Sequence, residues 1–323
     1  MPAFFRRARA FVALAAALSA LHASAAYPER PVKLVVPYAP GGGTDVVARV
    51  IAQKMSADLH EQVYVENKGG AGGSVGTEQV AHAPADGYTI MLVPTSHVIN
   101  PSIYKLSFDT EKAFAPISMV ASTPILVAVP VSSPAHNLKE LVKVAHTNPE
   151  AVANYGSSGT GSVFHLATET FKREYKVDAT HIPYKGGGPA VMALLSGEVQ
   201  LVFETMLTLG PQVKAGRARA LAVASRKRSP LMPDVPTATE QGFPVLQATN
   251  DYMLFAPAGT PKPVIDTLYH SVQKVLKDPD TVANLAKQGA DVVGSSPDQL
   301  AAYVHREIPR WAAAAKQAHL QQD

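Results

Sequence analysis

The sequence predicts an α/β protein with two domains and mostly parallel sheets. A chain of 323 residues is long enough for two domains of ordinary size. Short apolar runs alternate with segments of helical periodicity along almost the whole chain. Glycine-rich segments at residues 41–43, 156–161 and 186–188 each fall between a predicted strand and a predicted helix. These observations favour repeated strand–helix units, in which covering helices connect parallel strands.

The predicted strands are mostly continuous apolar runs, a pattern typical of strands that are buried on both faces. The prolines stand mainly where these runs end. Residues 229–242, with three prolines, are predicted to be an extended connector. In chain order the predicted strands occupy residues 32–36, 88–93, 125–129, 153–155, 181–182, 199–203, 220–224 and 253–255.

Helices are predicted where apolar residues recur every three or four positions. Residues 189–196 begin with a proline and are followed by Gly197, the usual punctuation of a helix. The other helical patterns are Val47, Ile51 and Met55, then Phe164, Ala167 and Phe171, and the amphipathic segments 263–277 and 297–317.

Composition excludes several classes of protein. Apolar residues make up 46% and charged residues 17% of the chain, which suits a folded core and not a disordered chain. The net charge is +3, but Arg6, Arg7 and Arg9 stand in a leading segment that has no acidic residue. The remainder is neutral, so it lacks the basic surface that nucleic-acid binding needs.

The cysteine and histidine content argues against a metal site. The chain has no cysteine, which excludes disulfides, thiolate metal sites and cysteine nucleophiles together. No two of its eleven histidines lie within five residues of each other, so two histidines on one helical face are not available for zinc. We expect no metal and no cofactor, and we expect His97 and His165 to be structural groups.

The first 26 residues have the features of a secretory signal peptide. Three arginines precede an apolar run at residues 11–21, and Ala23-Ser24-Ala25 is a small-residue cleavage site. The run is shorter than the roughly 20 residues that span a bilayer. We expect cleavage near Ala25 or Ala26 and a mature chain outside the cytoplasm. The alternative is an N-terminal core helix.

The three glycine-rich loops are candidate anion-binding sites, because each precedes a predicted helix. The N-terminus of a helix carries unpaired N–H donors and the positive end of the helix dipole, and glycine lets a ligand approach the backbone closely. If two loops come from different domains, they would face each other in the crevice at the carboxyl ends of the strands. The alternative is that each loop is only a tight turn.

A nucleotide is not the expected anion, because neither glycine-rich phosphate motif is present. In the second loop Gly159 and Gly161 are followed by Phe164, where the last glycine of the dinucleotide motif should stand. Lys185 is the only cation in the three loops, so neutral donors, dipoles and water should hold the ligand. These features favour a carboxylate over an uncharged solute.

Two further side chains invite a functional interpretation. Residues 72–76 match the Gly-x-Ser-x-Gly pattern of hydrolases around Ser74, but the preceding predicted strand ends at Val65, too early for a nucleophile elbow. An exported serine hydrolase is therefore an alternative that we do not favour. Glu204 directly follows an apolar strand; it either faces the cleft as a hydrogen-bond acceptor or lies on the surface.

At these residues the sequence resembles the substrate-binding proteins of tripartite tricarboxylate transporters, also called Bug proteins. The resemblance covers nearly the whole mature chain, and its motifs occur in order at consistent spacing. The principal motifs are Tyr27-Pro28, Pro37-Tyr38-Ala39-Pro40-Gly41-Gly42, Glu66-Asn67-Lys68-Gly69-Gly70-Ala71-Gly72-Gly73, Pro84-Ala85-Asp86-Gly87-Tyr88, Asn100-Pro101, Tyr155-Gly156-Ser157, Pro183-Tyr184-Lys185-Gly186, Lys214-Ala215-Gly216, Pro233-Asp234-Val235-Pro236 and Phe255-Ala256-Pro257.

This resemblance implies a periplasmic receptor of the type II, or Venus-flytrap, binding-protein fold, in which two domains close about a hinge. In that family a ligand carboxylate is held between two glycine loops, with bridging waters. Carried over to this sequence, the ligand-binding residues are Tyr38, Ala39, Gly42, Gly43, Ser157, Gly159, Thr160, Ser162, Tyr184 and Gly186, with Ser96 from a further cleft-lining stretch.

The resemblance also implies a place in transport. The receptor would capture a small carboxylate or amino-acid-like ligand and deliver it to a transporter with large and small integral membrane subunits. The alternative is presentation of the ligand to a sensor. Residues 27–122 with 226–323 are predicted as the first domain and residues 123–225 as the second, with hinges near 122–124 and 224–250. We expect a monomer.

The chain departs from its family near Glu204, where many members carry aspartate. The longer side chain would shorten the space at the far end of the ligand, so the ligand of a relative cannot be assumed here. If Glu204 is ionised and faces the cleft, it disfavours a second ligand carboxylate and favours an amine or a hydroxyl. A change to glutamine should then alter ligand affinity.

Overall fold

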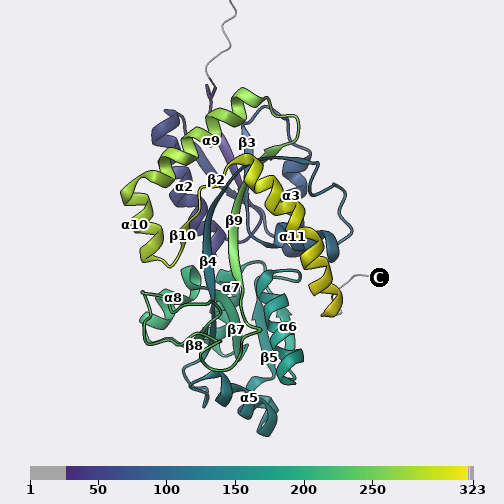
Figure 1. Cartoon of the computed structure of the whole chain (residues 1–323), viewed down its shortest axis with the longest axis vertical. Coiled ribbons are helices and arrows are strands. Elements are labelled where there is room, and N and C mark those ends of the chain that lie inside the picture. Colours follow the sequence, from purple (N-terminus) through teal and green to yellow (C-terminus); the bar gives the residue numbers. More distant parts are fainter. Residues whose placement is uncertain (1–26, 319, 321–323) are drawn as a thin grey trace, which may run out of the picture.

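The protein forms two α/β lobes that are joined by two long strands (Figure 1). The computed structural model describes residues 27–318 and residue 320, so the predicted signal peptide lies outside the described residues. The strands are β1 (Val32–Val36), β2 (Val63–Asn67), β3 (Thr89–Val93), β4 (Phe114–Pro130), β5 (Asn154–Ser157), β6 (Thr180–Pro183), β7 (Leu201–Thr205), β8 (Ala218–Val223), β9 (Thr249–Pro257) and β10 (Asp291–Val292).

The helices follow the strand–helix alternation that the sequence predicts. The third glycine loop leads into its helix two residues earlier than expected, because the helix begins at Gly187 and not at Pro189. The helices are α2 (Gly43–Leu59), α3 (Ser74–Ala81), α4 (Ser96–Ile99), α5 (Leu138–Thr147), α6 (Val163–Tyr175), α7 (Gly187–Ser196), α8 (Met206–Lys214), α9 (Lys262–Lys277), α10 (Pro279–Lys287) and α11 (Pro297–Gln317).

Paired strands run through both lobes in the order β2-β1-β3-β9-β4-β7-β5-β6. In the first lobe β1 pairs in parallel with β2 and β3, and in the second lobe β5 pairs in parallel with β6 and β7. The long strands β4 and β9 are antiparallel to each other and connect these two parallel sets. The predicted α/β architecture is confirmed, and the three glycine loops follow the parallel strands β1, β5 and β6.

Helices cover both faces of each sheet, which explains why the strands are continuous apolar runs. In β1, Leu34 and Val36 belong to the core under α2 and α9, whereas Val35 belongs to the core under α3 and α11. In β4, Val127 packs toward α5 and α6, and Leu126 packs toward α7 and α8. Each face of each sheet therefore has its own apolar layer.

Strand β4 is much longer than the five residues that the sequence predicts. Its first part contains two prolines and the polar residues Ser118, Ser122 and Thr123, a composition that argues against a buried strand. The structure satisfies these side chains from distant parts of the chain. Ser118 Oγ donates to the carbonyl of Ser295 at 2.7 Å, and Thr123 Oγ1 donates to that of Gly289 at 2.8 Å.

The polypeptide passes from one lobe to the other at the middle of β4 and again at the start of β9. Strand β4 pairs with β9 up to Pro124 and with β7 from Ile125 onward. Residues 229–248, assigned by the sequence to the first domain, contribute Ala238 and Phe243 to a core of the second lobe. The domain limits and hinges stay predictions, and this packing favours a return boundary near Thr249.

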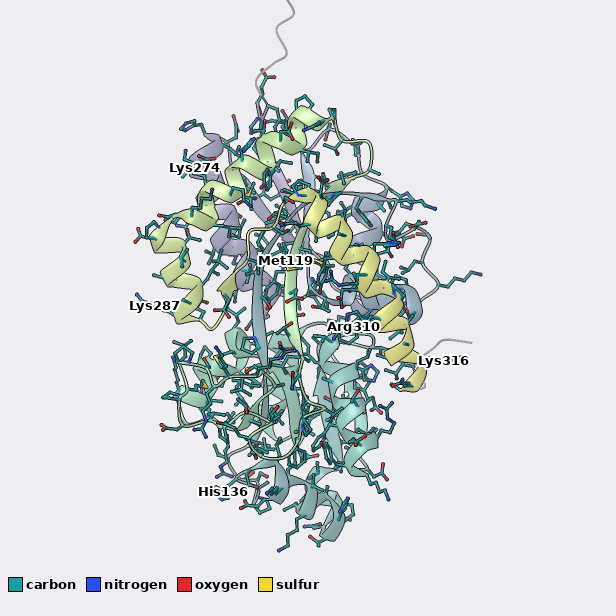
Figure 2. All side chains as sticks on the ribbon, viewed as in Figure 1. Met119, His136, Lys274, Lys287, Arg310 and Lys316 are labelled. Carbon is teal, nitrogen blue, oxygen red and sulfur yellow. The ribbon has the colours of Figure 1, made fainter. Side chains whose placement is uncertain are left out.

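Helix α11 also extends from one lobe toward the other. Leu300 packs in a core of the first lobe, whereas Ala315 packs in a core of the second. Figure 2 shows Arg310 and Lys316 along the part of α11 that reaches the second lobe. Within residues 27–318, no helix has the length and apolar character needed to cross a membrane.

Candidate functional site

The first glycine loop connects β1 to α2 and is held by a carboxylate of its own helix. The amide of Gly41 donates to Asp45 Oδ2 at 3.0 Å, and Asn67 Nδ2 donates to Asp45 Oδ1 at 3.0 Å. Burial alone would raise the pKa of Asp45, but these bonds and one from Arg49 lower it. Asp45 is therefore ionised, and its hydrogen bonds hold the loop in place. Gly42 is the N-cap residue of α2, and Gly43 is the first residue of the helix.

The second loop connects β5 to α6, and its hydroxyl groups shape its own backbone. Ser157 is fully buried; its Oγ accepts from the amide of Gly159 at 3.1 Å and lies 2.7 Å from His181 Nε2. Ser162 Oγ caps α6 by accepting from the amide of His165 at 3.2 Å. Ser157 and Ser162 thus contribute mainly by presenting the loop.

Two stacked histidines lie beneath this second loop. The ring centroids of His165 and His181 are 3.8 Å apart, and His165 Nδ1 accepts from the amide of Gly161 at 3.3 Å. Burial lowers the pKa of His165 to about 3 and that of His181 to about 4. Both rings are therefore neutral at physiological pH, and His165 has the structural role that we expected.

The third loop, residues 184–188, presents its backbone to the first lobe, and its tyrosine forms a hydrogen bond within the second lobe. The hydroxyl of Tyr184 donates to Glu198 Oε1 at 2.6 Å. Glu198 thus occupies the Tyr184 hydroxyl, and a place for Tyr184 in the lining of the cleft stays a prediction. Gly186 does lie at the interlobe boundary, where a Cβ would be 3.2 Å from the amide nitrogen of Ala39.

The glycine loops of the two lobes face each other and touch. The amide of Ala39 donates to the carbonyl of Lys185 at 2.8 Å. A Cβ on Gly42 would lie 3.3 Å from the amide nitrogen of Gly187. On the other side of the boundary, the hydroxyl of Tyr104 donates to the carbonyl of Thr160 at 2.8 Å. The N-termini of α2 and α7 thus converge across the boundary.

A polar network in the first lobe closes one side of this region. The hydroxyl of Tyr38 donates to the carbonyl of Gly72 at 2.7 Å and lies 2.5 Å from Ser96 Oγ. Asn100 Nδ2 donates to the same carbonyl at 3.0 Å, while Asn100 Oδ1 is buried without a partner. Tyr38 and Ser96 are therefore brought together as expected, and Asn100 joins them.

On the second lobe, Glu204 is buried at the carboxyl end of β7. Its side chain is only 1% exposed, so the surface alternative is wrong. The amide of Thr205 donates to Glu204 Oε1 at 2.8 Å, and Oε2 has no partner. Burial raises the pKa of Glu204 to about 8. The neutral acid therefore predominates at pH 7, contrary to the ionised state considered from the sequence.

Tyr252, on β9, belongs to the same buried cluster and was missed by sequence reasoning. Its hydroxyl has no hydrogen-bond partner, and a Cβ on Gly43 would collide with it. Burial, the largest influence, raises the pKa of Tyr252, and Glu204 raises it further. Nothing in the apolar run around Tyr252 distinguishes it from a core residue, because its neighbours in the site come from α2 and β7.

The structure does not support the hydrolase alternative. Ser74 begins α3, seven residues after β2 ends at Asn67, and its Oγ donates to the carbonyl of Ala71 at 2.9 Å. His97 is enclosed by Phe114 and Phe255 in the first lobe, as expected of a structural group. Across residues 27–318, no group of three histidine, aspartate or glutamate residues is arranged to hold a metal ion.

Residues 47–320 match a family model described as the tripartite tricarboxylate transporter family receptor. The chain is also similar to the solved structure of the periplasmic binding protein BugD, with 38% identity, a TM-score of 0.88 and coverage of 92% of this chain and 100% of that one.

Two similar solved structures contain a bound small carboxylate. MatC from Rhodopseudomonas palustris with bound malate is 34% identical, with a TM-score of 0.85 and coverage of 89% of this chain and 99% of that one. A second R. palustris protein, with adipate, is 34% identical, with a TM-score of 0.87 and coverage of 91% and 98%.

Proposed function

Because the chain belongs to the tripartite tricarboxylate transporter receptor family, we propose that it captures a small organic carboxylate between its two lobes and delivers it to a membrane transporter. Members of this family are solute-binding receptors of the periplasm. We propose a small carboxylate as the ligand of this chain, residues of the glycine loops and the cleft walls as its binding site, and integral membrane subunits as the partner.

The observation that carries the proposal is the meeting of the glycine loops at the N-termini of α2 and α7. Two helix ends aimed at one place supply unpaired N–H donors and two positive dipole ends without any cation. Glu204 Oε2 and the Tyr252 hydroxyl are buried beside these helix ends without partners, and Asn100 Oδ1 is buried without a partner beside Gly161 of the second loop. Buried polar groups normally have a partner. A ligand with several polar atoms would satisfy them.

The proposed ligand-binding set has two kinds of members. Backbone donors come from the loops, and side-chain groups come from the walls of the cleft. Tyr184 enters the set only through its backbone. The set consists of Tyr38, Ala39, Gly42, Gly43, Ser96, Asn100, Ser157, Gly159, Thr160, Ser162, Tyr184, Gly186, Glu204 and Tyr252.

Capture requires the lobes to separate first. The direct bond between Ala39 and Lys185 joins the two loops, so a ligand that binds between them must displace it or bind beside it. Closure around the ligand would then exclude water and strengthen the attraction between the helix dipoles and the carboxylate. The crossings at Pro124 and Thr249 are the places where we expect the hinge to bend.

A ligand screen tests the proposal directly. We expect malate, adipate or a related small carboxylate to raise the melting temperature of the mature chain, because a ligand at a hundred times its dissociation constant stabilises a protein by about 2.7 kcal/mol. Isothermal titration should then give one site per chain. Stabilisation by uncharged analogues and not by carboxylates would contradict the proposal.

Delivery is tested separately from capture. We expect the loaded protein to support ligand uptake by vesicles that contain the large and small integral subunits, and the ligand-free protein to support none. Recovery of a sensor ectodomain instead, in a pull-down from membrane fractions, would favour the signalling alternative. Hydrolysis of an ester panel that is lost in Ser74→Ala would favour the hydrolase.

A further inference from the structure

A cavity of about 260 Å³ lies where α11 meets the second lobe, and none of its lining residues belongs to the proposed ligand-binding set. Its walls come from α6, from residues 245–248 and from the second half of α11, the part of the helix on which Figure 2 labels Arg310. Small side chains leave this space open, because four of the lining residues are alanines. They are Ala167, Ala224, Ala248 and Ala314.

The lining of this cavity combines apolar side chains with two arginines and contains no acidic residue. Leu166, Leu246 and Trp311 contribute apolar surface, and the exposed residues Arg173 and Arg310 contribute positive charge. Sites for small molecules are typically apolar, with a few polar groups that fix the orientation of the ligand. The lining therefore fits a molecule with one anionic end and an apolar remainder.

Both arginines can turn donors toward an anion without leaving a carboxylate unpaired. Arg173 Nη1 donates to the carbonyl of Gln317 at 2.8 Å, so this bond does not neutralise its charge. Arg310 Nη1 donates to Glu307 Oε2 at 2.8 Å. Glu307 also accepts from Arg306 Nε at 3.1 Å and would keep that cation. A guanidinium group has five N–H donors, so each arginine has donors to spare.

Trp311 adds an unsatisfied donor to the same cavity. Its Nε1 is buried and has no hydrogen-bond partner among the described residues, although a buried indole N–H normally finds one. Trp311 also lines an adjacent cavity of about 320 Å³, but Asp251 and Glu307 line that one too and disfavour an anion there. An acceptor for the indole N–H is therefore expected in the cavity that has no acid.

We propose that the cavity between α11 and the second lobe is an accessory binding site for a small amphipathic anion. Its head group would meet Arg173, Arg310 and the Trp311 N–H, and its apolar tail would lie against Leu166 and Leu246. The arginines repel an ammonium group, and a neutral alcohol gains only the apolar contacts. The site lies outside the cleft between the glycine loops, so this inference goes beyond the proposed function and does not depend on it.

The only tryptophan of the chain reports on this site directly. We would titrate the isotope-labelled mature chain with hexanoate, hexanol and hexylamine at pH 7 and follow the single indole N–H resonance by NMR. We expect hexanoate to shift this resonance downfield, because the indole N–H gains an acceptor. We expect hexanoate to bind at least about tenfold more tightly than the alcohol or the amine.

Two variants test the residues of the site. Ala167→Phe fills the cavity and should abolish the hexanoate-induced shift, and Ala314→Leu should do so from the opposite wall. Arg173→Gln removes one charge at an exposed position and should weaken hexanoate binding about fivefold. Ala301→Phe and Arg217→Gln, both at exposed positions outside the cavity, are the matched controls and should bind as the wild type does. Thermal melting shows that each variant is folded.

The outcomes separate this site from the interlobe cleft. Equal binding of hexanol and hexanoate would overturn the preference for an anion. Hexanoate binding that leaves the indole resonance unchanged, or that persists in both folded cavity-filling variants, would place the anion elsewhere and overturn the site. Failure of hexanoate to bind at all would overturn it as well. None of these results decides whether the cleft captures a carboxylate, which the ligand screen tests separately.

Discussion

At the scale of single residues, burial decides the charge of His97, inside the first lobe, and of Glu204, at the interlobe boundary. Burial lowers the pKa of His97 to about 3 and raises that of Glu204 to about 8. Neither group has an oppositely charged partner, so the neutral form is the one that the fold accommodates. The chain therefore surrounds a proposed anion site with donors that carry no net charge.

The buried histidines make the protein sensitive to acid. In the unfolded chain a histidine binds a proton below about pH 6.5, whereas folded His97 stays neutral down to about pH 3. The stabilisation that neutral His97 contributes is therefore complete above about pH 6.5, its pKa in the unfolded chain. This stabilisation is lost as the pH falls toward about 3, the pKa of His97 in the folded protein. We expect His97→Phe to reduce the slope of stability against pH by about 1.4 kcal/mol per pH unit between pH 6 and pH 4.

Urea unfolding at a series of pH values measures this slope. The exposed His270 provides a control, and His270→Phe should leave the slope unchanged. An unaltered slope in His97→Phe would mean that the His97 imidazole binds a proton as readily in the folded protein as in the unfolded chain, and it would contradict the prediction.

Gly43 and Gly42 should respond differently to alanine. A Cβ on Gly43 would collide with Tyr252 and lie 2.8 Å from Thr205 Oγ1, so we expect Gly43→Ala to destabilise the protein by about 1–3 kcal/mol. A Cβ on Gly42 meets only the backbone of Gly187 and Gly188, at 3.3 Å or more. Gly42→Ala should therefore cost less stability and mainly weaken closure. Denaturant unfolding compares the two, and equal stabilities would contradict the packing around Gly43.

At the scale of elements, each helix that opens at a glycine loop is set by short-range signals. Gly42 is the N-cap residue of α2, Ser162 caps α6, and Gly197 ends α7 in a left-handed conformation. These signals act within one turn of chain, so the sequence alone places the loops at the helix N-termini. Their mutual approach depends on contacts between lobes.

Helix α11 offers a test of such a local signal. Ser296 Oγ accepts from the amide of Gln299 at 3.2 Å, and Gln299 Oε1 accepts from the amide of Ser296 at 2.8 Å, which together form a capping box. We expect Ser296→Ala to lower the free energy of unfolding by about 1 kcal/mol. Urea unfolding measures the loss, with the exposed Ser132→Ala as control; an effect no larger than the control's would contradict it.

At the scale of the whole molecule, the lobes are held together by few polar contacts. The bond from Ala39 to Lys185 and that from Tyr104 to Thr160 join loops of opposite lobes. A bond of this kind contributes about 1 kcal/mol, so a ligand of moderate affinity is enough to shift the balance between open and closed forms.

Removal of one such bond should open the unliganded protein. Because the chain has no cysteine, His136→Cys and Lys274→Cys provide two specific labelling sites on opposite lobes (Figure 2). We expect Tyr104→Phe to increase the population of the wide label separation about fivefold, measured by single-molecule energy transfer. The same change at Tyr64, away from the boundary, should have no effect. Identical distributions for Tyr104→Phe and the wild type would mean that this bond does not restrain the lobes.

The α/β architecture, the strand–helix alternation and the positions of the glycine loops could be predicted from the amino-acid sequence, because apolar periodicity and helix caps act over a few residues. Its resemblance to the Bug proteins also indicated the family. The first half of β4 was not predictable, since Ser118 and Thr123 are satisfied by residues more than 150 positions away.

The protonation state of Glu204 and the membership of Tyr252 and Asn100 in the candidate site could not be predicted from local sequence patterns. Each of these side chains owes its environment to segments that are remote in sequence: Glu204 to α7, Tyr252 to α2, and Asn100 to the glycine segment before α3. Burial fixes the protonation of a carboxyl group, and burial between two lobes is a property of their packing, which no local pattern of residues records.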